Sequence, residues 1–167
     1  HEVRTQTWTH TESSGTSYEL ANIIARLYPT ETKRIILATH YDSQKISFKN
    51  SSNQNQPSPG ANNSASGVAV LVELARLLGN SHVVPSVGVG VDIVFFDGEE
   101  GEESQGADFT NWKPLGSTYF IQHLNEIYGN NKPVSGVVLD MVCDKDLKIS
   151  KEASSAKNAP TQTEAFW

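Results

Sequence analysis

A buried strand and two adjacent carboxylates follow one another in the stretch Val91-Asp92-Ile93-Val94-Phe95-Phe96-Asp97-Gly98-Glu99-Glu100-Gly101. Residues 91–96 are nearly all apolar, which is typical of a strand covered on both faces. Runs of the same kind lie at 34–39 and 134–139. In open parallel sheets, ligands bind beyond the carboxyl ends of the strands. The stretch therefore predicts an α/β domain with Glu99 and Glu100 at the ligand-binding edge of its sheet.

Helical periodicity separates these runs. One helix is predicted to end at Gly79, with Ser64 or Ser66 capping its start. Another is predicted over 117–128, and a third over 18–27, ahead of the first strand. The apolar positions expected to face the core are Val68, Leu71, Val72, Ala75 and Leu78 in the first helix, Phe120, Ile121, Leu124 and Ile127 in the second, and Leu20, Ile23, Ile24 and Leu27 in the third. Alternating strands and helices predict parallel neighbours with right-handed crossovers.

Composition narrows the class of protein. The 167 residues include 13 Lys and Arg against 19 Asp and Glu, a net charge of −6, which argues against a nucleic-acid partner. No apolar stretch is long enough to predict a membrane span. The single cysteine, Cys143, excludes an intrachain disulfide and a cysteine-based zinc cluster. A single domain is expected over 1–167, and the absence of an initial Met or a leader suggests a mature or trimmed product.

Two segments lack helical or strand periodicity. Residues 43–60 are rich in Ser, Asn, Gln, Lys and Pro, and residues 101–115 are mostly polar. Connections of this length within one domain are usually functional or mobile loops. The polar tail over 150–167 is interpreted either as a frayed end or as the start of a further part of the protein.

Possible ligands follow each predicted strand. His40 and Asp42 follow the first, Glu99 and Glu100 the second, and Asp140 the third. Imidazole and carboxylate groups are common ligands of a hydrolytic zinc ion. Each has a simpler alternative: a strand-end turn at 40–42, a solvated acidic loop at 99–100, and a helix cap or exposed strand end at Asp140.

Four segments, taken in order, resemble the M28 zinc exopeptidases, a group that includes aminopeptidases and glutaminyl cyclases. They are Ala38-Thr39-His40-Tyr41-Asp42-Ser43, then Pro59-Gly60-Ala61-Asn62-Asn63-Ser64-Ala65-Ser66-Gly67-Val68-Ala69, then Phe95 to Gly101, then Leu139-Asp140-Met141-Val142. Residues 22–26 and 111–117 are most similar to the glutaminyl-cyclase-like branch. The resemblance covers most of residues 17–149 and implies a three-layer α/β/α fold with a mixed, mostly parallel central sheet.

The resemblance also implies roles for the strand-end residues and a zinc cofactor of one or two ions. His40 is implied as a zinc ligand and Asp42 as the partner of its other ring nitrogen. Glu99 is implied as the general base, which later acts as the acid toward the leaving amine. Glu100 is implied to bind the first metal and Asp140 the second.

The sequence departs from the family pattern in two places. Asn63 stands where the family has a carboxylate that bridges the two metals. Its amide offers one neutral oxygen and an NH₂ group that donates hydrogen bonds, so weak or single-metal binding is expected. The family's last ligand is a histidine well beyond the third motif, but the last histidine here is His123, ahead of Asp140. A missing C-terminal part, a substitute ligand or an inactive site are the alternatives.

The leading hypothesis is a zinc-dependent aminopeptidase that hydrolyses the N-terminal bond of a peptide. One alternative is cyclisation of an N-terminal glutamine on the same scaffold, with Trp112 lining the substrate pocket. Trp112 is equally well explained as an anchor for its loop. The other alternative is a non-catalytic relative that keeps the fold. The family's habit of export and the low cysteine content favour a secreted or periplasmic location.

Overall fold

The computed structural model describes residues 1–44, 58–80, 88–101, 112–149 and 153–158. These residues form a five-stranded sheet with the order β1-β2-β4-β3-β5. The strands are β1 (Glu2–Thr11), β2 (Ser17–Leu27), β3 (Arg34–His40), β4 (Gly90–Phe96) and β5 (Ser135–Val138). The helices are α1 (Ala65–Gly79), α2 (Leu115–Gln122), α3 (Leu124–Tyr128) and the short α4 (Ala153–Asn158).

The sheet is mixed, as predicted, although two of its four strand pairings are parallel rather than most of them. Strand β3 pairs in parallel with both β4 and β5, while β1–β2 and β2–β4 are antiparallel. The parallel part is formed by the three runs that the sequence predicts as buried strands, but the third is wrong in its burial: β5 lies at the edge of the sheet, with Val138 69% exposed. The antiparallel part comes from the hairpin at the amino terminus.

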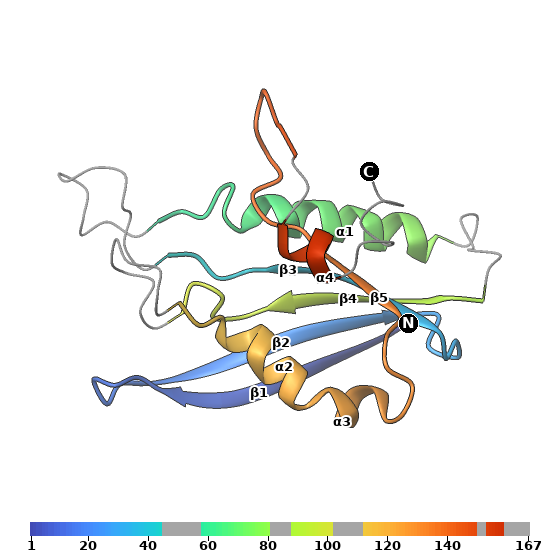
Figure 1. Ribbon diagram of the computed structural model, residues 1–167, viewed down its shortest axis with the longest axis horizontal. Helices are drawn as coiled ribbons and strands as arrows, with labels where there is room; N and C mark the ends of the chain where they lie inside the picture. The colour runs from blue at the N-terminus through green and yellow to red at the C-terminus, as the bar shows by residue number, and fades with distance from the viewer. Residues whose placement is uncertain (45–57, 81–87, 102–111, 150–152, 159–167) are drawn as a thin grey trace.

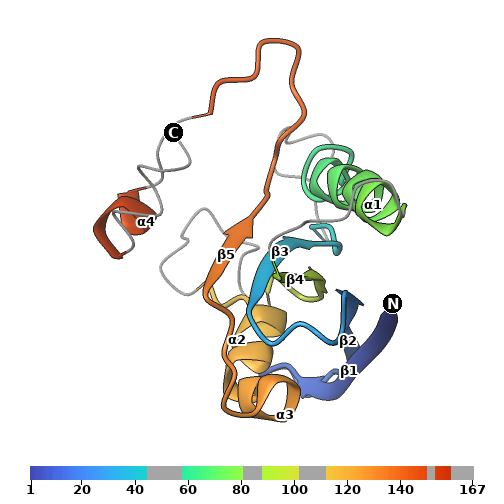
Figure 2. The ribbon, with the colours of Figure 1, turned by 90° about the vertical axis from the view of Figure 1, so that its right-hand side faces the viewer.

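Helices cover both faces of this sheet (Figure 1), and Figure 2 shows α1 on one side with α2 and α3 on the other. Each face has its own apolar cluster. On the α1 side, Leu71 packs with Leu27, Val91 and Ile93. On the opposite side, Phe120 and Tyr128 pack against strand residues that include Ile24 and Val94. Because both faces are covered, β4 is buried along nearly its whole length, and the predicted three-layer arrangement is confirmed.

The predicted helix over 18–27 is wrong: this segment is β2. The spacing of its apolar residues fits a helix, but β-branched Ile23 and Ile24 also favour a strand. Pairing with β1 on one edge and β4 on the other satisfies its backbone. Asn22 is fully buried within it and donates hydrogen bonds from Nδ2 to Gln6 and Gly116, each at 2.9 Å. These partners lie far from Asn22 in sequence, so local periodicity could not reveal them.

The other two predicted helices form, with changes in detail. The segment 117–128 is divided at His123 into α2 and α3, and Gly129 ends α3 with a φ of 55°. Two predicted core positions are wrong, since Val72 is 56% exposed and Ile121 is 64% exposed. In α1, Leu74 rather than Val72 packs against the core.

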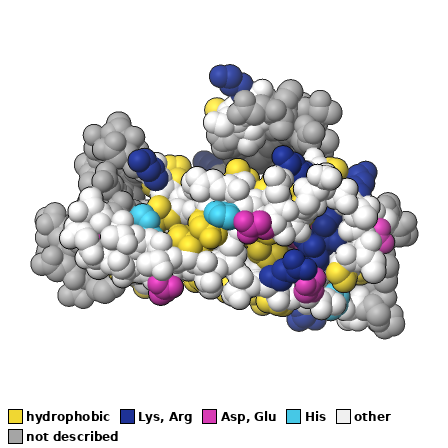
Figure 3. Space-filling view, turned by 90° about the horizontal axis from the view of Figure 1, so that it is seen from below, with side chains coloured by type: hydrophobic (Ala, Val, Ile, Leu, Met, Phe, Trp, Pro, Cys, Tyr) yellow, Lys and Arg dark blue, Asp and Glu magenta, His cyan; other side chains and the backbone are white. Residues whose placement is uncertain are grey.

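On the surface formed by β1, α2 and α3, basic side chains gather on one part with acidic side chains directly beside them (Figure 3). Within the described ranges, no helix has the length and apolar character needed to cross a membrane. Of the two predicted long loops, residues 45–57 and 102–111 lie outside the described residues.

Candidate metal centre

The parallel pairing of β4, β3 and β5 brings the predicted ligands to one edge of the sheet. His40 is the last residue of β3 and lies opposite Phe96 of β4. Two backbone hydrogen bonds continue the ladders beyond the strands, from Tyr41 N to Phe96 O at 3.0 Å and from Leu139 N to Ala38 O at 2.8 Å. The residues that follow each strand are therefore held side by side.

Asp42 joins the first two of these segments. Its Oδ1 lies 3.2 Å from Nδ1 of His40. The same carboxylate accepts the backbone N–H of Glu99 at 3.1 Å and that of Glu100 at 3.0 Å. The contact with His40 was predicted, whereas the two backbone contacts were not. Asp42 therefore orients both the histidine and the pair of glutamates.

His40 is buried, and its two ring nitrogens face different carboxylates. Nδ1 lies 3.8 Å from Oε2 of Glu99, in addition to its contact with Asp42. Nε2 lies 3.4 Å from Oδ1 of Asp140 and makes no hydrogen bond within the described part of the chain. The third strand thus delivers Asp140 to the same site.

Asn63 and Glu100 form a pair at this site. Nδ2 of Asn63 donates a hydrogen bond of 2.6 Å to Oε1 of Glu100, which is a buried carboxylate. Oδ1 of Asn63 is buried and has no hydrogen-bond partner among the described residues. The amide therefore turns its donor toward Glu100, as its chemistry predicts, and leaves its oxygen unpaired.

Ser64 occupies the N-cap position of α1, but its side chain makes no cap hydrogen bond. Its Oγ instead donates to the backbone oxygen of Asp42 at 2.8 Å. Ser66, the other predicted cap, donates from Oγ to the backbone oxygen of Asn62 at 2.6 Å. The serines at the start of α1 therefore connect the loops around the site.

The order of these segments and their convergence point to a known group of proteins. The family model described as Peptidase family M28 matches residues 22–166. The chain belongs to this family. The resemblance stated from the sequence is thereby confirmed.

Other M28-like proteins are similar over different lengths. A glutaminyl-peptide cyclotransferase of Bos taurus is 33% identical over 110 residues, which cover 62% of this chain and 27% of the relative. A Zn-dependent exopeptidase from Parabacteroides distasonis is 31% identical with a TM-score of 0.85, and a glutaminyl cyclase of Bacteroides thetaiotaomicron bound to N-acetylhistamine is 30% identical with a TM-score of 0.86. Each comparison covers 99% of this chain and 56% of the solved structure. The chain thus spans about a quarter of that curated relative and just over half of these structures.

The donors at the M28 site fit a divalent cation. His40, Glu99 and Glu100 each offer one ligand atom, and these atoms lie within 4.8 Å of one another. The two unpaired buried atoms, Nε2 of His40 and Oδ1 of Asn63, are also of types that bind metals. A buried polar atom without a partner is costly, and a bound cation removes that cost.

The carboxylates around His40 favour the protonated form of its ring. Burial disfavours the charged ring, but Asp140 and Asp42, together with Glu99, outweigh burial and raise the pKa of His40 to about 10. Without a metal, His40 is therefore protonated at neutral pH. A cation must displace this proton, so metal binding is expected to weaken as pH falls.

The pKa values of Glu99 and Glu100 are raised, whereas the pKa of Asp42 is lowered. Burial raises the pKa of Glu99 to about 7, and the carboxylates of Glu100, Asp140 and Asp42 add to this effect against the influence of His40. Burial also raises the pKa of Glu100. Burial alone would raise the pKa of Asp42 too, but its hydrogen bonds from His40 and the two backbone N–H groups lower it.

Trp112 lies beside Glu99. Its Nε1 donates a hydrogen bond of 2.9 Å to the backbone oxygen of Glu99, and the residue is 43% exposed. The contact attaches this end of the loop to the glutamate segment, as one sequence interpretation predicted. The exposed part of the residue still leaves an aromatic surface near the site, so a substrate-binding role stays a prediction.

Proposed function

We propose that this chain carries the metal-binding and acid–base residues of a zinc-dependent exopeptidase acting on the N-terminal residue of peptides. The observation that carries the proposal is the gathering of His40, Glu99 and Glu100 around one space, with Asp140 beside His40. Mixed imidazole and carboxylate ligands suit zinc in hydrolytic sites. A half-buried glutamate next to such a site suits a general base.

In this proposal His40, Glu100 and Asp140 hold zinc, and Asn63 contributes its unpaired oxygen. When bound, zinc polarises a carbonyl group and lowers the pKa of water. Asp42 keeps His40 oriented through Nδ1, so that Nε2 is directed to the cation. Since position 63 has an amide instead of a carboxylate, one ion is expected rather than two.

Glu99 moves the proton in the proposed hydrolysis. Water adds across the N-terminal peptide bond: its hydroxyl group joins the carbonyl carbon, the C–N bond breaks, and the remaining proton goes to the leaving amine. Glu99 takes that proton and returns it to the amine nitrogen. Its pKa of about 7 supports both steps near neutral pH.

The second candidate is cyclisation of N-terminal glutamine, which the names of two relatives favour. In this reaction the substrate's α-nitrogen bonds to its own side-chain carbonyl carbon, and the amide nitrogen leaves as ammonia. Glu99 would carry the proton from the attacking amine to the leaving nitrogen. The exposed indole of Trp112 beside Glu99 supports this candidate, because it offers an apolar surface for a small side chain.

Two assays separate the candidates. The zinc-loaded chain is incubated with an aminoacyl arylamide and, separately, with a glutaminyl peptide, while arylamine, ammonia and peptide mass are followed. Release of arylamine supports the peptidase, and ammonia release without loss of a residue supports the cyclase. Glu99→Gln is expected to abolish either activity while zinc stays bound. A wild-type chain that takes up no zinc after dialysis against micromolar zinc contradicts both and favours a non-catalytic relative.

A further inference from the structure

The segment that follows β5 has an unusual backbone. Asp140 comes after the strand, and Met141, next to it, has a φ of 48°. Residues with a side chain seldom adopt positive φ, and they keep it only where surrounding contacts impose it. The side chain of Asp140 is itself 42% exposed, so packing does not fix its position. Contacts from elsewhere must therefore hold this segment.

Those contacts come from the loop that precedes α1 and from its first turn. The backbone N–H of Val142 donates to Oγ of Ser66 at 3.0 Å, and that of Cys143 donates to Oδ1 of Asn62 at 3.0 Å. Oγ of Ser66 also donates to the backbone oxygen of Asn62, which makes the two residues one unit. The sequence alone predicts only a helix cap at Ser66.

This unit connects two parts of the metal centre. Asn62 immediately precedes Asn63, which contacts Glu100, and the segment it binds begins at Asp140, which lies 3.4 Å from His40. The residue after Ser66, Gly67, packs so closely that a Cβ there would lie 2.9 Å from the backbone oxygen of Leu139. The start of α1 is thus pressed against the end of β5 directly beside the site.

We propose that Asn62 and Ser66 are positioning residues that hold Asp140 beside His40 and thereby set the affinity for the cation. The inference rests on the proposed function, because it assigns Asp140 to the metal site. Neither residue needs to touch the metal. Each acts through the backbone of 141–143, which otherwise is free to carry Asp140 away from the site.

The test compares zinc affinity in Asn62→Ala, Ser66→Ala, Asp140→Asn and the double variant Asn62→Ala/Asp140→Asn. Removing a residue that orients a metal ligand typically weakens binding by about tenfold or more, and this loss is expected for both single alanine variants. Because Asn62 acts through Asp140, the double variant is expected to bind zinc no more weakly than Asp140→Asn alone. Asn80→Ala, which changes an asparagine at the other end of α1, is the matched control and should bind like the wild type.

Amide hydrogen exchange provides a readout that does not need the metal. The N–H groups of Val142 and Cys143 are expected to be protected in the wild type, and Asn62→Ala should speed exchange at Cys143 about tenfold or more if its hydrogen bond is what protects it. Asn62→Asp keeps an acceptor oxygen at this position and should restore protection. Ser66→Ala should have the corresponding effect at Val142.

The outcomes are distinct. Independent, additive losses of zinc affinity in Asn62→Ala and Asp140→Asn overturn the inference, since they mean that Asn62 acts on the site by another route. Unchanged affinity in Asn62→Ala also overturns it. A wild-type chain without zinc contradicts the proposed function instead. In that case amide hydrogen exchange alone tests the positioning contact. Equal exchange at Cys143 in wild type and Asn62→Ala refutes it.

Discussion

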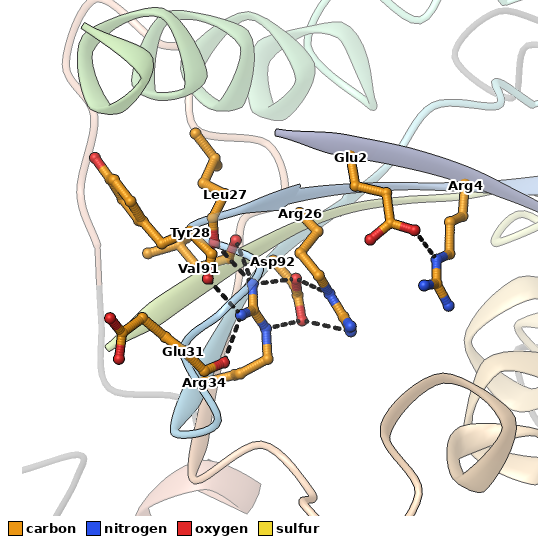
Figure 4. A network of polar contacts seen from close by, with 9 residues as sticks. All are labelled: Glu2, Arg4, Arg26, Leu27, Tyr28, Glu31, Arg34, Val91 and Asp92. Carbon is orange, nitrogen blue, oxygen red and sulfur yellow. Dashed lines mark hydrogen bonds and ion pairs between the residues drawn. The ribbon is translucent and has the colours of Figure 1, made fainter. Parts of the chain in front are cut away.

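Strands β3 and β4 carry buried charged groups at both ends, but only one end balances them. Where the strands begin, the carboxylate of Asp92 is fully buried between Arg34 and Arg26 (Figure 4). Where they end, His40 is the one basic side chain facing Asp42, Glu99 and Asp140 in the described contacts. The same sheet thus holds a balanced cluster, in which the buried carboxylate has basic partners, and an unbalanced one, in which a single histidine faces three carboxylates.

The balanced cluster also satisfies its hydrogen bonds. Arg34 binds both oxygens of Asp92, at 2.8 and 2.7 Å. Its remaining N–H groups donate to the backbone oxygens of Leu27, Tyr28, Glu31 and Val91. At the other end, Nε2 of His40 and Oδ1 of Asn63 stay unpaired within the described residues. The buried charges of Arg34 and Asp92 are therefore paired at one end of these strands, whereas polar atoms at the other end have no partner in the described part of the chain.

Replacing Arg34 in the balanced cluster is expected to destabilise the fold most. Arg34→Met leaves Asp92 buried with Arg26 alone and removes the donors to four backbone oxygens. Breaking a buried ion pair in this way typically costs about 3–5 kcal/mol, so the free energy of unfolding measured in urea should fall by about that amount. The matched control is Arg76→Ala, which breaks the exposed pair with Glu73 on α1. Similar urea midpoints for the two variants would mean that the Arg34 cluster does not stabilise the fold.

The two clusters are also expected to respond to pH in opposite senses. Without metal, Glu99 has a pKa of about 7 when folded against 4.5 for an ordinary glutamate, so the folded chain keeps a proton that the unfolded chain loses. The stability that this proton contributes is complete below pH 4.5 and is lost as pH rises through about 7. Asp92 behaves in the opposite sense: Arg34, Tyr128 and Arg26 lower its pKa against the effect of burial, so its contribution is lost as pH falls below 3.8.

Glu99→Gln should therefore reduce the decline in stability between pH 5 and pH 7.5 by on the order of 2 kcal/mol. Urea unfolding of wild type and variant at both pH values, with a chelator present, measures this. His40 contributes a decline of the same direction, because its folded pKa is also raised, so the variant should retain part of the slope. A wild-type chain whose stability rises across this range would contradict the description of the unbalanced end.

A smaller effect comes from changing Asn63 to Asp. The substitution removes the donor to Glu100 and adds a carboxylate, so it increases the imbalance of the site. Zinc affinity should rise by about tenfold or more, because one more negative charge faces the cation. Stability without metal should fall for the same reason. Titration calorimetry with zinc measures the first effect, and Asn80→Asp at the far end of α1 serves as a control of equal charge. Equal affinity in Asn63→Asp and wild type would show that position 63 does not face the cation.

The ends of β3, β4 and β5 could be predicted from sequence because their cause is local. Each strand is an apolar run that soon gives way to polar residues, and β3 and β4 are covered on both faces, whereas β5 is an edge strand with Val138 69% exposed. The positions of His40, Glu99 and Asp140 follow from parallel pairing alone. The family resemblance then gave these residues their expected roles.

The rest depends on partners distant in sequence. The spacing of Leu20, Ile23 and Ile24 suits a helix as well as a strand, and only pairing with β1 and β4 decides between them. Asp92 stands as a lone carboxylate inside an apolar run, and nothing in its neighbourhood identifies Arg34 as its partner. The same holds for Asn62, whose partner Cys143 lies 81 residues away in sequence.

The smallest change in stability is expected at the edge of the balanced cluster, where Figure 4 shows Glu2 and Arg4. Their side chains lie 2.6 Å apart on β1 and are 39% and 48% exposed, so water reaches both charges. The hydrogen bond from Arg4 lowers the pKa of Glu2, yet this contact is screened by solvent and by salt. Glu2→Gln should therefore leave the urea midpoint unchanged within error at neutral pH, whereas Asp92→Asn on β4, measured in parallel, should lower it clearly. A loss in Glu2→Gln comparable to that in Asp92→Asn would mean that the stabilising network extends to the surface, and the distinction between the buried cluster and its exposed margin would not hold.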